Sequence, residues 1–234
     1  MGRLTIILLA LVATLPAAND WPCVSRKSPD RSYVDIAETT GGQVILAAPG
    51  EIEKTTFLHI QRPSHSDTVY RSTGSLYNET REFRFPVDST IESLLVSVML
   101  ACKGEIAIFT GQGTEPPAEA TEGAQIKGGR IARILRPQPG EWTLHLRGNG
   151  FYSIVVEAKS TLHYSPTPPT PETRYRLTGD EGQTLMSLEG PPPADLTAPY
   201  PRYRVAMEGA DEQGFPFQRL TRQMLLSPPA NPPK

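Results

Sequence analysis

The sequence predicts a mainly β protein, in which a β-sandwich of the jelly-roll type is followed by a second, small β unit. The chain has 24 prolines and 19 glycines, and only 7% of its residues are aromatic. This composition favours many turns between short strands over long helices. Between residues 83 and 156, apolar side chains recur at every second position in several short runs, with no helical stretch between them. Such runs are typical of a sandwich.

Residues 1–18 have the order of a secretory signal peptide. Arg3 is followed by an apolar run from Leu4 to Leu15 and then by Pro16-Ala17-Ala18. The run is shorter than the about 20 apolar residues that span a bilayer, and no later segment is apolar enough to do so. The alternative is an uncleaved anchor or a buried helix. We expect cleavage after Ala18 and a secreted, extracellular protein that does not insert into a membrane after cleavage.

Residues 19–56 predict a short helix-strand segment. From Arg31 to Glu38, apolar residues recur with helical spacing, and Gly41-Gly42 can end the helix. Val44-Ile45-Leu46 then predicts a short buried strand. The segment is too small to bury a core of its own. The expected apolar face of the helix consists of Tyr33, Ile36 and Ala37, and Ser32 is the expected cap at its start.

The β-sandwich is expected over residues 57–164. Residues 57–78 are polar and lack a period, which predicts mainly loop. Gly111–Gly129 predicts a second loop without core residues, and Gly148-Asn149-Gly150 predicts a hairpin turn. Trp142 alternates with polar neighbours and is expected in the core. The expected strands lie at 83–87, 94–101, 106–108, 131–135, 142–146 and 152–156.

Residues 165–171 read Ser-Pro-Thr-Pro-Pro-Thr-Pro, which predicts a stiff, extended linker and a domain boundary. Beyond it, residues 172–226 again show short strands. With about 55 residues, this unit is small for independent folding and is expected to lean on the sandwich. The Pro-rich tail, residues 227–234, is expected to be disordered.

Two cysteines and one sequon are candidate modification sites. In an oxidising compartment, Cys23 and Cys102 predict one disulfide, which would stabilise the fold by about 2–4 kcal/mol. Two separate thiols are the alternative. Asn78-Glu79-Thr80 is an N-glycosylation sequon, which matters only in a host that glycosylates.

The sequence offers no convincing catalytic constellation, so we expect no enzyme, no cofactor and no metal. It has no Gly-x-Ser-x-Gly elbow and no His-Glu-x-x-His pair. His145 is expected on the outward face of its strand. His59 and His65 could meet around a metal, but no third ligand lies near them. Asp88-Ser89-Thr90 and Asp211–Gly214 are expected to be capped turns rather than acidic metal loops.

Charge is balanced along the chain, whose formal net charge is −2. This excludes the strongly basic surface of a nucleic-acid-binding protein. Six arginines on or beside strands could bind an anionic glycan or phosphate if they shared a face. Between Ile60 and Ser165, however, the chain has eleven Lys/Arg residues and eleven Asp/Glu residues, and this balance favours an ordinary solvated surface. The six are Arg81, Arg84, Arg130, Arg133, Arg136 and Arg147.

Five stretches, in this order, resemble parts of one family. Tyr33–Ile45 is similar to the closing helix and strand of the von Willebrand factor A domain in hemicentin-like extracellular proteins. Phe85–Ile91 and Pro139–Leu144 resemble the first strand and the Pro-Gly-x-Trp-x-Leu hairpin of the galactose-binding-like sandwich that follows it there. Tyr203–Asp211 and Gly214–Arg219 resemble the Ig-like unit that comes next. The resemblance implies a galactose-binding-like fold for the sandwich, an Ig-like fold for the second unit, and extracellular adhesion.

One departure limits what the resemblance implies. A complete A domain carries an Asp-x-Ser-x-Ser metal site, and no such motif occurs in this chain. We therefore carry over no metal ligand. The sequence predicts a secreted, non-catalytic binding or adhesion module that engages an extracellular protein or glycan through the sandwich loops Gly111–Gly129 and Asn78–Arg81. A structural accessory or spacer of an extracellular assembly is the alternative, and a secreted hydrolase ranks behind both.

Overall fold

The computed structural model describes residues 29–53, 55, 66–102, 104–193, 196 and 198–227, and this part of the protein is mainly β, as the sequence predicts. Among these residues, no helix is long and apolar enough to cross a membrane. The expected signal peptide and Cys23 lie outside them. The strands are β1 (Asp67–Val87), β2 (Ile91–Leu100), β3 (Glu105–Phe109), β4 (Thr121–Ile126), β5 (Gly129–Leu135), β6 (Gly140–Ser160), β7 (Arg174–Thr178), β8 (Thr184–Leu188), β9 (Arg202–Ala210), β10 (Pro216–Leu220) and β11 (Leu225–Leu226).

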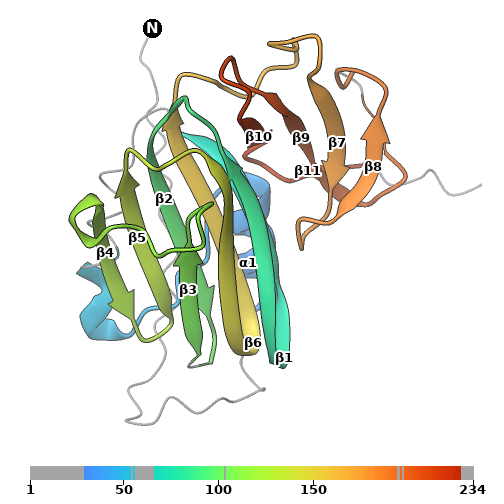
Figure 1. Ribbon diagram of the computed structural model, residues 1–234. Coiled ribbons are helices and arrows are strands. Elements are labelled where there is room, and N and C mark those ends of the chain that lie inside the picture. Colours follow the sequence, from blue (N-terminus) through green and yellow to red (C-terminus); the bar gives the residue numbers. More distant parts are fainter. Residues whose placement is uncertain are drawn as a thin grey trace, which may run out of the picture.

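The β-sandwich is built around two long strands that pass through both of its layers (Figure 1). β1 and β6 pair antiparallel along almost their whole length. In one layer, β6 also pairs with β3, as far as Arg147. From Tyr152 onward β6 pairs with β2, and this second layer continues through β5 to β4. Opposite the residues at which β6 changes its partner strand, the pairing register of β1 shifts between Tyr77 and Glu79. Asn78, at this shift, has a φ of 56°, a left-handed conformation that asparagine adopts more readily than most residues.

Three sequence-based expectations about loops are wrong. The part of the expected loop that the structure describes contains the first half of β1, from Asp67 onward. Gly148-Asn149-Gly150 is no hairpin turn but the bend within β6. Gly111–Gly129 contains β4, whose Ile126 is buried. In the second case the chain uses the positive φ of Gly150 to bend a strand instead of reversing it.

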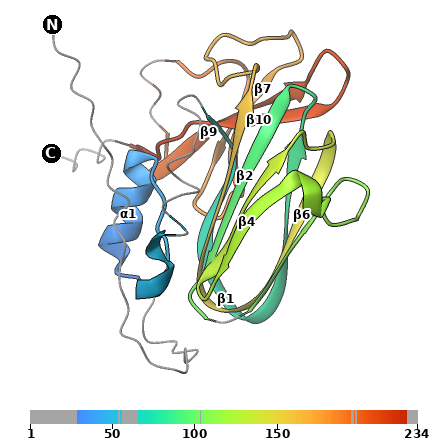
Figure 2. The same cartoon turned by 90° about the vertical axis from the view of Figure 1, so that its left-hand side faces the viewer.

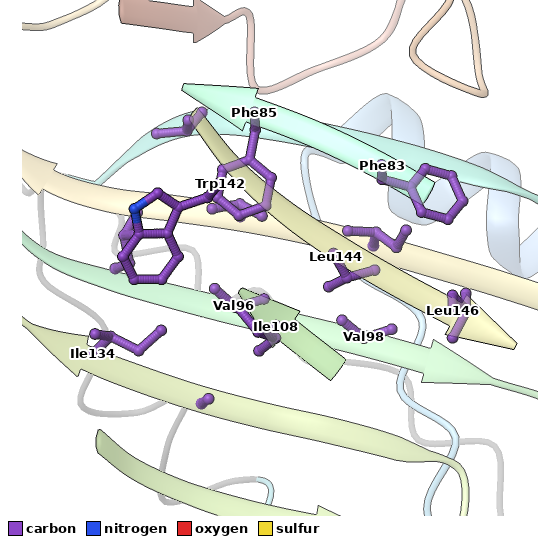
Figure 3. Packing of buried hydrophobic residues seen from close by; sticks show 14 of the residues in the cluster. Phe83, Phe85, Val96, Val98, Ile108, Ile134, Trp142, Leu144 and Leu146 are labelled. Atoms are coloured by element: carbon purple, nitrogen blue, oxygen red, sulfur yellow. The ribbon is translucent and has the colours of Figure 1, made fainter. Parts of the chain in front are cut away.

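The core of the sandwich lies between its two layers (Figure 3). Phe83, Phe85 and Leu144 come from the layer of β3, and Val96 and Ile134 from the layer of β2. Trp142 is only 1% exposed, as expected from its strand alternation, and its Nε1 donates to the carbonyl oxygen of Gln138 at 2.9 Å. The alternating pattern in the sequence thus predicts the core correctly.

The N-terminal segment covers the outer face of the β2–β5 layer. Helix α1 (Arg31–Thr40) lies against one side of the sandwich (Figure 2), and the extended residues 44–47 pack with Leu95 and Met99. A 3-10 turn, η1 (Pro49–Glu51), follows, and a second one, η2 (Ala118–Ala120), precedes β4. The segment therefore shares a hydrophobic cluster with the sandwich instead of needing its own.

The orientation of α1 differs from the expected one. Tyr33 and Ile36 are 43% and 58% exposed, whereas Glu38 is only 3% exposed. Ala37 alone of the expected apolar face packs against the cluster below the helix. The cap is also different, because Asp30 accepts a hydrogen bond from the amide of Ser32 at 2.8 Å. Gly41, with a φ of 72°, ends the helix as predicted.

The second unit, β7 to β11, has its own hydrophobic cluster, which includes Tyr175, Val205 and Phe217. Its sheet is continuous with the sandwich, because β10 pairs with β1 at Thr68 and Leu220. Neither the boundary at residues 165–171 nor an Ig-like fold is tested by these pairings, and both stay predictions.

A buried ion pair and a capped turn also join the two units. Asp88 and Arg219 are both fully buried, with 2.8 Å between Oδ2 and Nη1. Arg219 also donates to the carbonyl oxygen of Leu162. Asp211 accepts hydrogen bonds from the amide and hydroxyl groups of Ser89 at 2.8 and 2.6 Å. Burial raises the pKa of Asp211, but these hydrogen bonds outweigh it and hold that pKa below its usual value.

Candidate functional site

An open groove of about 640 Å³ lies where α1, the sandwich and the second unit meet. We call it the interunit groove. Its lining comes mainly from four segments and also includes Arg81, Phe151 and Leu185. The four segments supply residues 29, 31, 34 and 35, residues 73–75 and 77 of β1, residues 179–181 and 183 of the β7–β8 turn, and residues 200–202 at the start of β9. The volume of the groove falls within the range of about 300–1,000 Å³ that is usual for ligand sites.

One wall of the interunit groove is the edge of β1. The amide of Thr73 donates to the carbonyl oxygen of Asp180 in the β7–β8 turn at 2.8 Å. Further along the edge, Ser75 stands opposite Phe151 of β6, and both line the groove. Tyr77, at the end of this wall, is 81% exposed. The wall therefore offers main-chain groups and one exposed aromatic ring.

The opposite wall is polar and charged. Arg202 donates a hydrogen bond to Asp35 of α1 at 2.5 Å and forms an ion pair with Asp180 of the β7–β8 turn at 3.0 Å. Arg31 lies 3.8 Å from Asp35, with both side chains exposed. Arg202, which lies in one lining segment, thus contacts carboxylates of two others.

Arg81 closes one end of the groove. Its Nη1 donates to Glu181 at 2.9 Å and to the hydroxyl of Tyr152 at 3.2 Å, and its guanidinium lies 5.7 Å from the centre of the Tyr152 ring. Burial raises the pKa of the Tyr152 hydroxyl. Three arginines and three carboxylates line the groove, so it carries no net charge and does not favour a strongly anionic ligand.

A buried charge cluster beneath the groove fixes α1 to both β units. Glu38 bonds Arg71 of β1 at 3.2 Å, accepts from the hydroxyl of Thr73 at 2.9 Å, and pairs with Arg204 of β9. The amide of Met224 donates to the main-chain oxygen of Glu38 at 2.9 Å. Burial lowers the pKa of Arg71 and of Arg204 to about 10, which still leaves both guanidinium groups charged at neutral pH.

The sequence-predicted modification sites lie outside the walls of the groove. Cys102 is buried just after β2, and because Cys23 is outside the described residues, their disulfide stays a prediction. Asn78 is exposed at the register shift in β1, next to Tyr77. A glycan on Asn78 would therefore stand at the rim of the groove.

The histidines and the six surface arginines form no common site in the described chain. His145 contacts Glu82 at 3.2 Å, and His163 contacts Asp67 at 2.7 Å. His59 and His65 lie outside the described residues. The six arginines are spread over β1, β5, β6 and the residue after β5, and Arg84 and Arg147 each pair with carboxylates. No group of three or more His, Cys, Asp or Glu side chains that could hold a metal occurs within the described ranges.

Comparisons with known proteins find similarity for part of the chain. A solved structure, described as the crystal structure of Bacillus licheniformis lipase BlEst2 in propeptide form, has a TM-score of 0.41 and 17% identity. The match covers 65% of this chain and 40% of the length of that one. A search of curated proteins finds no match. Residues 69–161, which run from β1 to the end of β6, match the family model of the hemicentin galactose-binding domain-like fold.

Proposed function

We propose that this protein is a secreted, non-catalytic binding module that holds an extracellular protein or glycan in the interunit groove. The observation that carries the proposal is the groove itself, because its walls come from all three parts of the fold and Arg202 pairs with carboxylates of two other lining segments. The match of residues 69–161 to a galactose-binding domain-like family adds support, since the name of that family describes a binding domain.

The lining chemistry favours binding over catalysis. Among the residues that the structure describes, neither a histidine nor a cysteine lines the groove. Asp35 and Asp180 both pair with Arg202. We also propose the interunit groove as the ligand-binding site in place of the two sandwich loops that the sequence suggests. Of the two loops named from the sequence, Asn78–Arg81 lies within β1 and supplies Arg81 to the lining, whereas Gly111–Gly129 supplies nothing.

Tyr77→Ala is expected to lower the affinity for the ligand about tenfold, or about 1.4 kcal/mol, because tyrosine is among the residue types that contribute most when a ligand covers them. The side chain is 81% exposed, so its loss should leave the fold intact. A glycan array and a pull-down from the native extracellular fraction would first identify binders, whose affinities are then measured. Tyr33→Ala is the matched control, since Tyr33 is also exposed but does not line the groove. Equal affinity of wild type and Tyr77→Ala would contradict the proposal.

A further inference from the structure

Within the described residues, the edge of β1 that faces the interunit groove carries main-chain groups without a main-chain partner. In an antiparallel pair, every second residue directs its N–H and C=O away from the partner strand. The amide of Thr73 points away from β6, because it donates to Asp180 in the β7–β8 turn. Ser75 and Tyr77 follow at intervals of two in the same register, so their amides point the same way. A second hydrogen bond supports this assignment. Phe151 of β6 lies opposite Ser75, and its carbonyl oxygen accepts from the amide of Ala101, on the side of β6 that faces away from β1. Phe151 and Ser75 therefore direct their main-chain groups away from each other.

No main-chain partner for these outward groups of Ser75 and Tyr77 exists in the part of the chain that the structure describes. The open edge is bounded at both ends. The β7–β8 turn occupies it at Thr73, and the register shift at Asn78 ends it after Tyr77. It therefore spans about 13 Å, the length of a few extended residues at about 3.3 Å each. An unpaired strand edge is a template for another extended chain.

We propose that the ligand of the groove is an extended peptide segment of a partner protein, which adds a short strand to β1 at Ser75 and Tyr77. This inference rests on the proposed function and names its ligand class. A polypeptide supplies alternating N–H and C=O groups at the spacing of the edge, which a glycan does not. The bond from Thr73 to Asp180 is the first step of the same ladder, already made within the protein.

The walls of the groove fit the side chains of such a strand. Successive side chains of an added strand point to opposite sides. Thr73 and Tyr77 point to the same face of β1, and the Thr73 hydroxyl contacts Glu38 of α1, so added side chains on that face meet α1 and the exposed ring of Tyr77. Added side chains on the opposite face meet the pair formed by Arg81 and Glu181. Because the lining is neutral overall, the peptide needs no strong net charge, and most of its affinity is expected to come from the main chain.

The test selects a binder from a phage-displayed library of random linear peptides and then alters the edge of β1. Ser75→Pro removes the outward N–H, which β6 does not use, and is expected to lower the affinity for the selected peptide at least tenfold. β1 already accommodates Pro86, and circular dichroism would verify the fold of the variant. Glu115→Pro is the matched control, because Glu115 lies in an exposed loop outside the groove and should leave the affinity unchanged.

Two further measurements report on the main chain directly. Hydrogen exchange at the amides of Ser75 and Tyr77 is expected to slow when the peptide binds, while that of Leu76, already directed at β6, changes little. N-methylation removes the N–H of a peptide residue. It should abolish binding at the alternate peptide residues whose N–H groups face β1, and leave binding unchanged at the residues between them.

Other outcomes overturn the inference and differ from failure of the proposed function. A glycan whose binding is lost in Tyr77→Ala but kept in Ser75→Pro would overturn the peptide ligand and leave the groove as the site. A concentration-dependent dimer that Ser75→Pro abolishes would make a second copy the occupant and overturn it as well. If no peptide is selected, the peptide inference is wrong. If neither variant changes the affinity of any binder, the peptide inference is wrong and the groove is not the site either.

Discussion

Replacing Glu38 with alanine is expected to lower the free energy of unfolding by about 3–5 kcal/mol. Glu38 is 3% exposed and pairs with Arg71 and Arg204, both of which are almost fully buried. Its removal leaves two buried guanidinium groups without their shared carboxylate, and an uncompensated buried charge is far more costly than a lost surface pair. Urea denaturation followed by circular dichroism measures the change.

Glu82→Ala is the control for this prediction. Glu82 also pairs with an arginine, Arg84, at 2.5 Å, but both side chains are substantially exposed. Exposed pairs contribute about 0–1 kcal/mol, so this variant should unfold almost like the wild type. If Glu38→Ala and Glu82→Ala lose similar amounts of stability, the Glu38 cluster is not what holds α1 against the two β units.

Asp88→Ala is expected to have an effect of the same size, about 3–5 kcal/mol, at the junction of the sandwich and the second unit. Asp88 and Arg219 are both fully buried, so the alanine variant leaves the Arg219 charge without a carboxylate. Asp88 also caps its own turn by accepting from the amide of Thr90 at 3.1 Å. Thermal and urea unfolding of the full chain measure the loss.

A second substitution separates the charge effect from the loss of the turn. Combining Asp88→Ala with Arg219→Met removes both charges and is expected to recover part of the lost stability, because no unpaired buried charge remains. Glu92→Ala, at an exposed carboxylate paired with Lys159, is the control and should cost less than about 1 kcal/mol. A double variant that is less stable than Asp88→Ala alone would show that Arg219 stabilises the junction without Asp88.

Strand alternation made the sandwich core predictable. Phe83, Phe85 and Trp142 point inward from strands that alternate with polar residues, and all three are buried. The position of Ile36 was not predictable in the same way. Helical spacing places Tyr33 and Ile36 on one face, but it does not say which face meets the protein, and the ion pairs of Glu38 decide that.

The candidate site could not be predicted from local sequence. Arg204 alternates with Tyr203 and Val205, which suggests an outward side chain, yet it is 1% exposed because Glu38 lies above it. Its partner, Glu38, is distant in the sequence, and the alternation of polar and apolar residues within one strand does not predict such a long-range ion pair. The groove likewise arises from segments near residues 31, 75, 180 and 202, which only the tertiary fold brings together.

Amide chemical shifts of isotopically labelled protein, recorded with and without the tightest binder from the glycan or peptide screens, test the central claim most directly. If the interunit groove is the ligand site, saturable shifts will occur together in α1, at Thr73–Tyr77 and in the turn at residues 179–183. Shifts confined to the loop at residues 111–117, or no saturable shift with any binder, would contradict it.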